Sequence, residues 1–137
     1  MTARRSLLIL AALLTLTAAA APQANAESGG EKKKGGGITY VQLPTLTATV
    51  LRGDGRRGVM TVEVGIDIAD AGLRSRAQMS QPLLRAAFVQ MLQLYASGLS
   101  PGAPPNADYI ARVLQQQTDN VLGARGGRLL LGTILIN

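Results

Sequence analysis

The chain has 137 residues, with 14 Lys and Arg against 8 Asp and Glu and with neither histidine nor cysteine. The lack of cysteine excludes disulfides and thiolate metal sites. Because histidine is missing too, the common nucleophile–base pairs are excluded, and acid–base chemistry would depend on carboxylates, lysine or tyrosine. The composition therefore favours a binding protein over an enzyme and indicates no cofactor and no metal.

Residues 1–26 have the architecture of a signal peptide. Arg4 and Arg5 form a short basic region, an apolar stretch follows over residues 7–21, and a small-residue triplet ends at Ala26. Because that stretch is shorter than the about 20 residues that span a bilayer as a helix, we expect cleavage after Ala26 and a periplasmic protein. The alternative is an uncleaved helix that anchors the domain in the inner membrane, facing the periplasm. The paired arginines fit a Sec or a twin-arginine signal.

Without Arg4 and Arg5 the mature chain keeps 12 basic and 8 acidic residues, a net charge of +4. Basic domains often bind nucleic acid, but this chain lacks interleaved aromatic and basic residues and has an export signal, so we expect no nucleic-acid partner. Residues 27–37 are Gly-rich, charged and free of apolar side chains, which predicts a flexible linker. Its lysines, Lys32 to Lys34, are either a solvated run or a peripheral contact with the inner membrane.

The predicted domain covers residues 38–137 and begins with two strands. The first, over residues 38–52, is interrupted by Pro44, which marks a bulge or an edge. Glycines in residues 53–58 predict a hairpin turn. Residues 59–69 then alternate between apolar and polar side chains, which predicts one buried and one wet face. The apolar side chains are Met60, Val62, Val64, Ile66 and Ile68.

Two helices are predicted next. Ser80 as a cap and Pro82 in the first turn indicate a helix that runs to about Ser97. Asn106 is expected to cap a second helix, which ends at the glycines of residues 123–127. The apolar stripes of these helices are Leu84, Ala87, Phe88, Met91, Leu92 and Tyr95, and Ile110, Val113, Leu114, Val121 and Leu122.

The last segment, Arg128 to Asn137 (RLLLGTILIN), is apolar on both faces. This predicts a strand in the middle of the sheet, or one covered by helices on one face and by a partner on the other. The order ββααβ predicts an α+β fold in which two helices pack on one face of a three-stranded sheet. A neighbouring subunit could cover the remaining apolar face, so we expect a homo-oligomer.

Candidate partner-contact residues come from the hairpin and the last strand. Arg56 and Arg57 are suited to pairing with carboxylates on another protein. Leu129, Leu131 and Leu135 belong to the apolar last strand. We expect these five residues to contact a partner.

Other polar residues are interpreted as surface. Glu63 and Asp67, four apart on one strand face with Asp70 nearby, would suit a divalent cation or acid–base chemistry, but solubilising that face explains them and is preferred. The remaining arginines and the glutamine run of the second helix are interpreted as mostly solvated. These residues are Arg74, Arg76, Arg125, Arg128, Gln115, Gln116 and Gln117.

Three segments together carry a resemblance to a known family. Tyr40 to Pro44 (YVQLP) before a strand, the hairpin Gly53 to Arg57 (GDGRR), and the strand Leu129 to Asn137 after two helices resemble the periplasmic domain of the flagellar basal-body-associated FliL family. The resemblance covers residues 38–137. It implies a stomatin-like fold, self-association into rings, and contact with the stator of the flagellar motor. FliL proteins usually keep an N-terminal membrane helix and a longer linker, and this chain departs from both.

Two functions are expected from these observations. The first is a non-catalytic periplasmic protein that supports the flagellar stator or basal body, and with it chemotactic motility, through self-association and protein contacts. The alternative is a general envelope module that binds proteins and is unrelated to motility. The cleavable-looking leader and the short linker favour this alternative.

Overall fold

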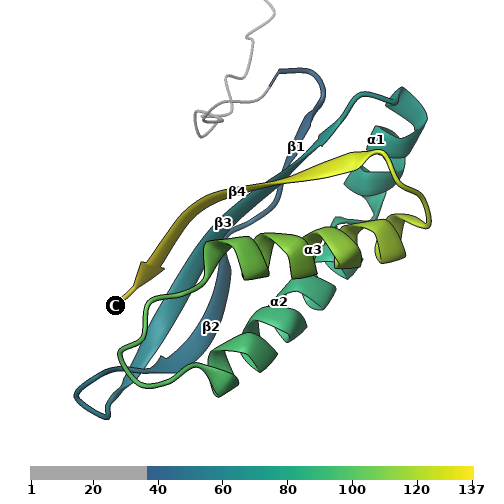
Figure 1. Ribbon diagram of the computed structural model, residues 1–137. Helices are drawn as coiled ribbons and strands as arrows, with labels where there is room; N and C mark the ends of the chain where they lie inside the picture. The colour runs from purple at the N-terminus through teal and green to yellow at the C-terminus, as the bar shows by residue number, and fades with distance from the viewer. Residues whose placement is uncertain (1–36) are drawn as a thin grey trace, which may run out of the picture. The chain divides into compact units, whose positions relative to one another are not determined.

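The computed structural model describes residues 37–137, which form one antiparallel sheet with helices packed on one of its faces (Figure 1). The elements are β1 (Tyr40–Gln42), β2 (Leu46–Leu51), β3 (Arg57–Ile68), α1 (Ala71–Met79), α2 (Gln81–Gly98), α3 (Ala107–Leu122) and β4 (Gly127–Ile136). The α+β class is confirmed, but the predicted order ββααβ lacks one strand and one helix. The signal peptide, the possible membrane anchor and all but the last residue of the predicted linker lie outside the described residues.

The first predicted strand is two strands, because Pro44 has no N–H to give to the ladder. β1 pairs with the second half of β3, and β2 pairs with the first half. Leu43 bridges the break: it is buried, and its N–H donates to the carbonyl of Val64 at 3.2 Å. The sheet therefore has four strands rather than the predicted three. Pro44 lies along the edge of the sheet, as predicted.

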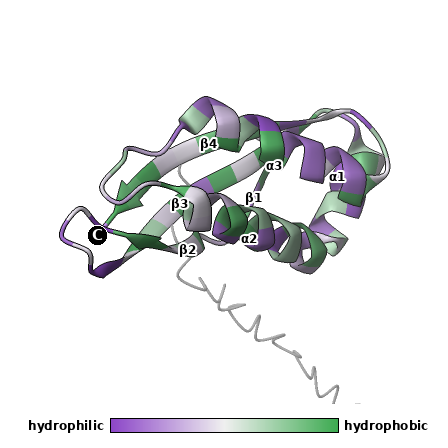
Figure 2. Ribbon diagram, turned by 60° about the horizontal axis from the view of Figure 1, so that its bottom comes forward, coloured by the Kyte–Doolittle hydropathy of each residue, from purple (hydrophilic) through white to green (hydrophobic). Residues whose placement is uncertain are grey.

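β3 is the central strand and pairs with all three others. Its predicted alternation is confirmed, because every second side chain from Met60 to Ile68 is buried beneath the helices. Val59, just before this run, and Glu63, within it, are exposed on the opposite face. That opposite face, which no helix of the described chain covers, is called the open face below (Figure 2).

α1 is the helix that the sequence analysis did not predict. Asp70 caps it, with its side chain accepting the N–H of Leu73 at 2.7 Å. Only two of its residues, Leu73 and Ala77, are buried. Ser80 lies at the junction with α2 and occupies the predicted N-cap position, but its side chain makes no capping hydrogen bond.

α2 and α3 cover the buried face of the sheet, α2 against β2 and α3 against β4 (Figures 1 and 2). Side chains from their predicted apolar stripes belong to the same core cluster as those of β3, and Phe88 is fully buried there. Asn106 caps α3 by accepting the N–H of Tyr109 at 3.0 Å, and Gly123 ends it with φ of 67°. Both ends of α3 are therefore as predicted. No helix within residues 37–137 has the length and hydropathy needed to cross a membrane.

β4 pairs with β3 alone, so it is an edge strand. Of the two predicted alternatives, the place in the middle of the sheet is wrong, whereas α3 does cover one face of the strand. A bulge opposite Glu63 shifts its register between Leu131 and Ile134. Because one extra residue reverses the alternation, Leu129, Leu131, Ile134 and Ile136 all share the buried face. This reversal explains how a strand that helices cover on one face only can be apolar at both odd-numbered and even-numbered positions.

Candidate interaction surfaces

Three large apolar side chains are exposed at the hairpin end of the open face. Leu51, Val59 and Leu135 are 48%, 47% and 53% exposed. They come from three neighbouring strands: Val59 is opposite Thr49 of β2, and Leu135 is opposite Thr61 of β3. We call these three residues the open-face cluster. Single exposed apolar residues are ordinary, whereas a group on an uncovered face is typical of a contact site.

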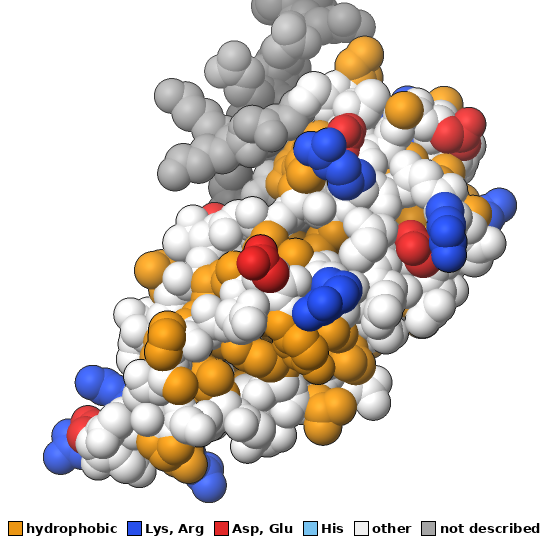
Figure 3. Space-filling view, viewed as in Figure 1, with side chains coloured by type: hydrophobic (Ala, Val, Ile, Leu, Met, Phe, Trp, Pro, Cys, Tyr) orange, Lys and Arg blue, Asp and Glu red, His pale blue; other side chains and the backbone are white. Residues whose placement is uncertain are grey.

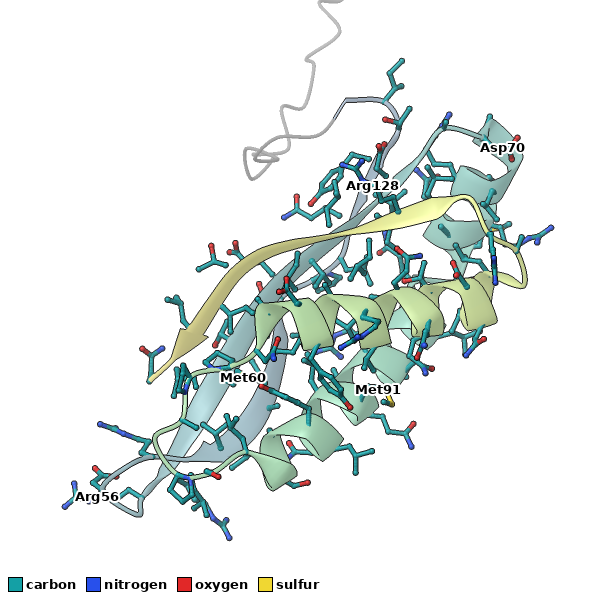
Figure 4. All side chains as sticks on the ribbon, viewed as in Figure 1. Arg56, Met60, Asp70, Met91 and Arg128 are labelled. Carbon is teal, nitrogen blue, oxygen red and sulfur yellow. The ribbon has the colours of Figure 1, made fainter. Side chains whose placement is uncertain are left out.

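The hairpin that joins β2 and β3 places Arg56 and Arg57 beside this cluster. Figure 4 shows Arg56 at the outer tip of the molecule. The Asp54 carboxylate accepts the backbone N–H of Arg56 at 3.0 Å and lies 4.0 Å from the guanidinium of Arg52. Both Arg56 and Arg57 are exposed, and within residues 37–137 neither guanidinium forms an ion pair or hydrogen bond. The structure thus leaves both predicted arginines accessible.

The three predicted leucines of β4 have different environments. Leu129 is 9% exposed and belongs to the core, opposite Ile66, so it is not available to a partner. Leu131 is half-buried and packs against the same core. Leu135 is the one of the three that is exposed. The prediction treated the run as uniform because sequence alone does not show the bulge.

Glutamine amides from the helices bond to the edges of the sheet. Gln93 of α2 accepts the N–H of Thr49 at 3.1 Å, on the outer side of β2. Gln115 of α3 accepts the N–H of Leu129 at 2.8 Å and donates to the carbonyl of Gly127 at 2.8 Å. Gln115 therefore blocks the first part of the β4 edge, and its interpretation as ordinary helix surface is wrong.

Two arginines that the sequence analysis treated as solvated are engaged in the fold. Arg74 donates to the carbonyl of Ile68 at 2.8 Å. Arg76 of α1 donates to the carbonyl of Leu122 at 3.0 Å, at the C-terminal end of α3. Such carbonyls have no partner within their own helix. These arginines stabilise the junction of α1 with its neighbours, and this role depends on contacts between residues far apart in the sequence.

The acidic residues Glu63, Asp67 and Asp70 are not gathered into a cluster of three. Glu63 and Asp67 lie on the open face with Gly65 between them, and Asp70 is occupied as the cap of α1. No three Asp or Glu side chains within the described part of the chain lie close enough to hold one metal ion. Gly65 is covered by the ring of Tyr40, which lies where a side chain at Gly65 would be.

A second apolar surface lies along the seam of α2 and α3, where Figure 3 shows hydrophobic side chains gathered. Tyr95 and Tyr109 stack there with ring centroids 5.5 Å apart, beside Met91 and Val113. The hollow between them has a volume of about 10 Å³, room for little more than one water molecule. This is below the range of pockets that enclose small organic ligands. Leu94, on the same helix as Met91, is 65% exposed.

Comparisons with known proteins give no relative: no family model, no curated protein and no solved structure matches the chain. The resemblance to the FliL family therefore stays a prediction from the three sequence segments quoted above.

Proposed function

We propose that the chain is a non-catalytic interaction protein of the bacterial envelope, which binds another protein through the open face of its sheet. The observation that carries this proposal is the open-face cluster of Leu51, Val59 and Leu135, together with Arg56 and Arg57 at its border. Apolar side chains surrounded by charged ones are the usual composition of a protein contact site. Arginines at the border can select a partner with carboxylates at matching positions.

The resemblance to the FliL family supplies the candidate partner. We propose the flagellar stator or basal body, so that the protein supports motility under mechanical load. The export signal predicted in residues 1–26 supports a periplasmic location for this contact. The alternative location, in the inner membrane with an uncleaved leader and the domain facing the periplasm, is compatible with the same proposal.

The test is swimming speed in media of rising viscosity, after deletion of the gene and complementation with three forms of the protein. Wild type should restore speed, and so should the control variant Leu83→Lys, whose substituted residue is exposed on α2. The variant Val59→Lys should not, because it places a charge within the open-face cluster. Comparable protein levels in all three strains are the control for folding and export. Normal speed of the deletion strain at every load would contradict the flagellar role.

The second candidate is a module that binds another protein complex of the envelope. It is favoured by the cleavable-looking leader and by a linker of only residues 27–37. A deletion strain with normal swimming but greater sensitivity to detergent would support it. Complementation with the Val59→Lys variant should then fail to restore detergent resistance, because both candidate functions use the same face.

A further inference from the structure

The last part of β4 has a free hydrogen-bonding edge. The N–H of Leu129 points away from β3, because it donates to Gln115. After the bulge, Asn137 exchanges both backbone hydrogen bonds with Val59, at 3.0 and 3.1 Å, so Asn137 faces β3. Since the direction of the backbone N–H and C=O groups alternates along an antiparallel strand, those of Ile134 and Ile136 point away from β3. Within residues 37–137 no side chain bonds to their backbone groups, in contrast to the groups that Gln115 covers.

This edge also lacks the features that prevent pairing with another strand. Native edge strands are usually protected by lysine, proline or an inward-pointing charge. From Leu129 to Asn137 the chain has neither a charged side chain nor a proline. Leu135 and Ile136 are 53% and 37% exposed. The arrowhead of β4 in Figure 1 extends beyond the first turn of α3, so that helix does not run alongside the end of the strand.

We propose that this edge binds the same edge of a second copy of the chain, with the two β4 strands antiparallel about a two-fold axis at Leu135. This inference goes beyond the proposed function, because it concerns the edge of β4 rather than the open face and names a second copy of the chain as the partner of that edge. The two sheets would become one continuous sheet, with the helices of both copies on the same side.

The residue types fit this arrangement on both faces. Leu135 meets Leu135 of the second copy on the open face, while Ile134 lies opposite Ile136 of the second copy on the helix face. Each Ile134–Ile136 pair exchanges two backbone hydrogen bonds, and cross-strand pairs of β-branched residues are favourable. A symmetric pairing places each side chain near its own type, so a charged strand would repel itself. The uncharged edge of β4 has no such penalty, and this favours a second copy over a charged partner strand.

The absence of cysteine in the chain makes a direct test possible. In the proposed pair the two Leu135 Cα atoms form a non-hydrogen-bonded pair about 4.5 Å apart, within the range that a disulfide spans. The full chain with Leu135→Cys should therefore form a disulfide-linked dimer under mild oxidation. The matched control is Leu130→Cys, on the same strand and the same face. Its two copies would be more than about 25 Å apart and should remain uncrosslinked.

A second variant separates pairing from folding. Ile136→Pro removes an N–H that points away from β3, so the ladder within one copy keeps its hydrogen bonds. We expect sedimentation velocity to show a dimer for wild type and for the control Ile136→Val, and a dissociation constant at least about tenfold higher for Ile136→Pro. A monomeric wild type, or equal crosslinking at positions 130 and 135, would overturn the inference. The proposed function would survive that result if Val59→Lys still impaired swimming. Conversely, a dimeric wild-type protein together with normal swimming of the deletion strain would overturn the stator role alone.

Discussion

The side-chain carbonyl of Gln115 accepts the backbone N–H of Leu129 at 2.8 Å, while the amide nitrogen of the same side chain donates to Gly127 and to Asp119. One helix residue thus supplies hydrogen-bond partners for backbone groups at the edge of β4 that would otherwise have none. The contact joins α3 to β4 across a separation of 14 residues. It also defines where the protected part of β4 ends and the free part begins.

Gln115→Ala should lower the free energy of unfolding by about 1–3 kcal/mol, because it leaves a half-buried N–H and carbonyl without partners. Urea denaturation measures this loss. Hydrogen exchange of the Leu129 amide should also become faster. The matched control is Gln116→Ala, one residue along the helix on its exposed side, which should change stability by less than about 0.5 kcal/mol. Equal effects of the two substitutions would contradict this role for Gln115.

Arg76→Ala should destabilise the protein by about 1–2 kcal/mol, because the carbonyl of Leu122 loses a charged donor. Thermal unfolding followed by circular dichroism checks this expectation. Arg125→Ala removes an equally charged side chain that forms no hydrogen bond within residues 37–137, and it should leave the melting temperature nearly unchanged. A melting temperature that falls equally in both variants would show that the effect comes from net charge and not from this hydrogen bond.

Gly102→Ala tests the contact between the loop after α2 and the β2–β3 hairpin. Gly102 has φ of 75°, and a Cβ there would lie 3.0 Å from the Cα of Gly53. Alanine is strained in that conformation and meets backbone, so we expect a loss of about 1–3 kcal/mol in urea denaturation.

Gly98→Ala is the control for that substitution, because Gly98 lies in the last turn of α2 with open space around it. It should be neutral or stabilise by up to about 1 kcal/mol. If Gly102→Ala were also neutral, the close approach of loop and hairpin would not exist in solution.

Local patterns were sufficient to predict much of the fold. The alternation from Met60 to Ile68 is a property of adjacent residues, and so are the capping of α3 by Asn106 and its end at Gly123. Pro44 was predicted to mark a bulge or an edge, and it lies along the edge of the sheet, but the break into two strands was not predicted. α1 was missed because only Leu73 and Ala77 are buried on it, too few for a recognisable apolar stripe.

The features of β4 depend on contacts that the sequence does not display. An apolar run such as the one from Leu129 to Ile136 is compatible with a central strand or with an edge strand. The bulge and the hydrogen bonds from Gln115 decide between these, and both depend on how distant segments meet. Of the residues predicted to contact a partner, Arg56, Arg57 and Leu135 are exposed, whereas Leu129 is buried.

The most direct test of the central claim is photocrosslinking in living cells with a photoreactive amino acid at Val59 of the full chain. The account predicts a discrete adduct that mass spectrometry identifies as a component of the stator or basal body. The same amino acid at Leu83, which is 65% exposed on α2, should give no such adduct. Identical adducts at both positions, or adducts at Val59 that contain only further copies of the chain, would contradict a partner-binding role for the open face.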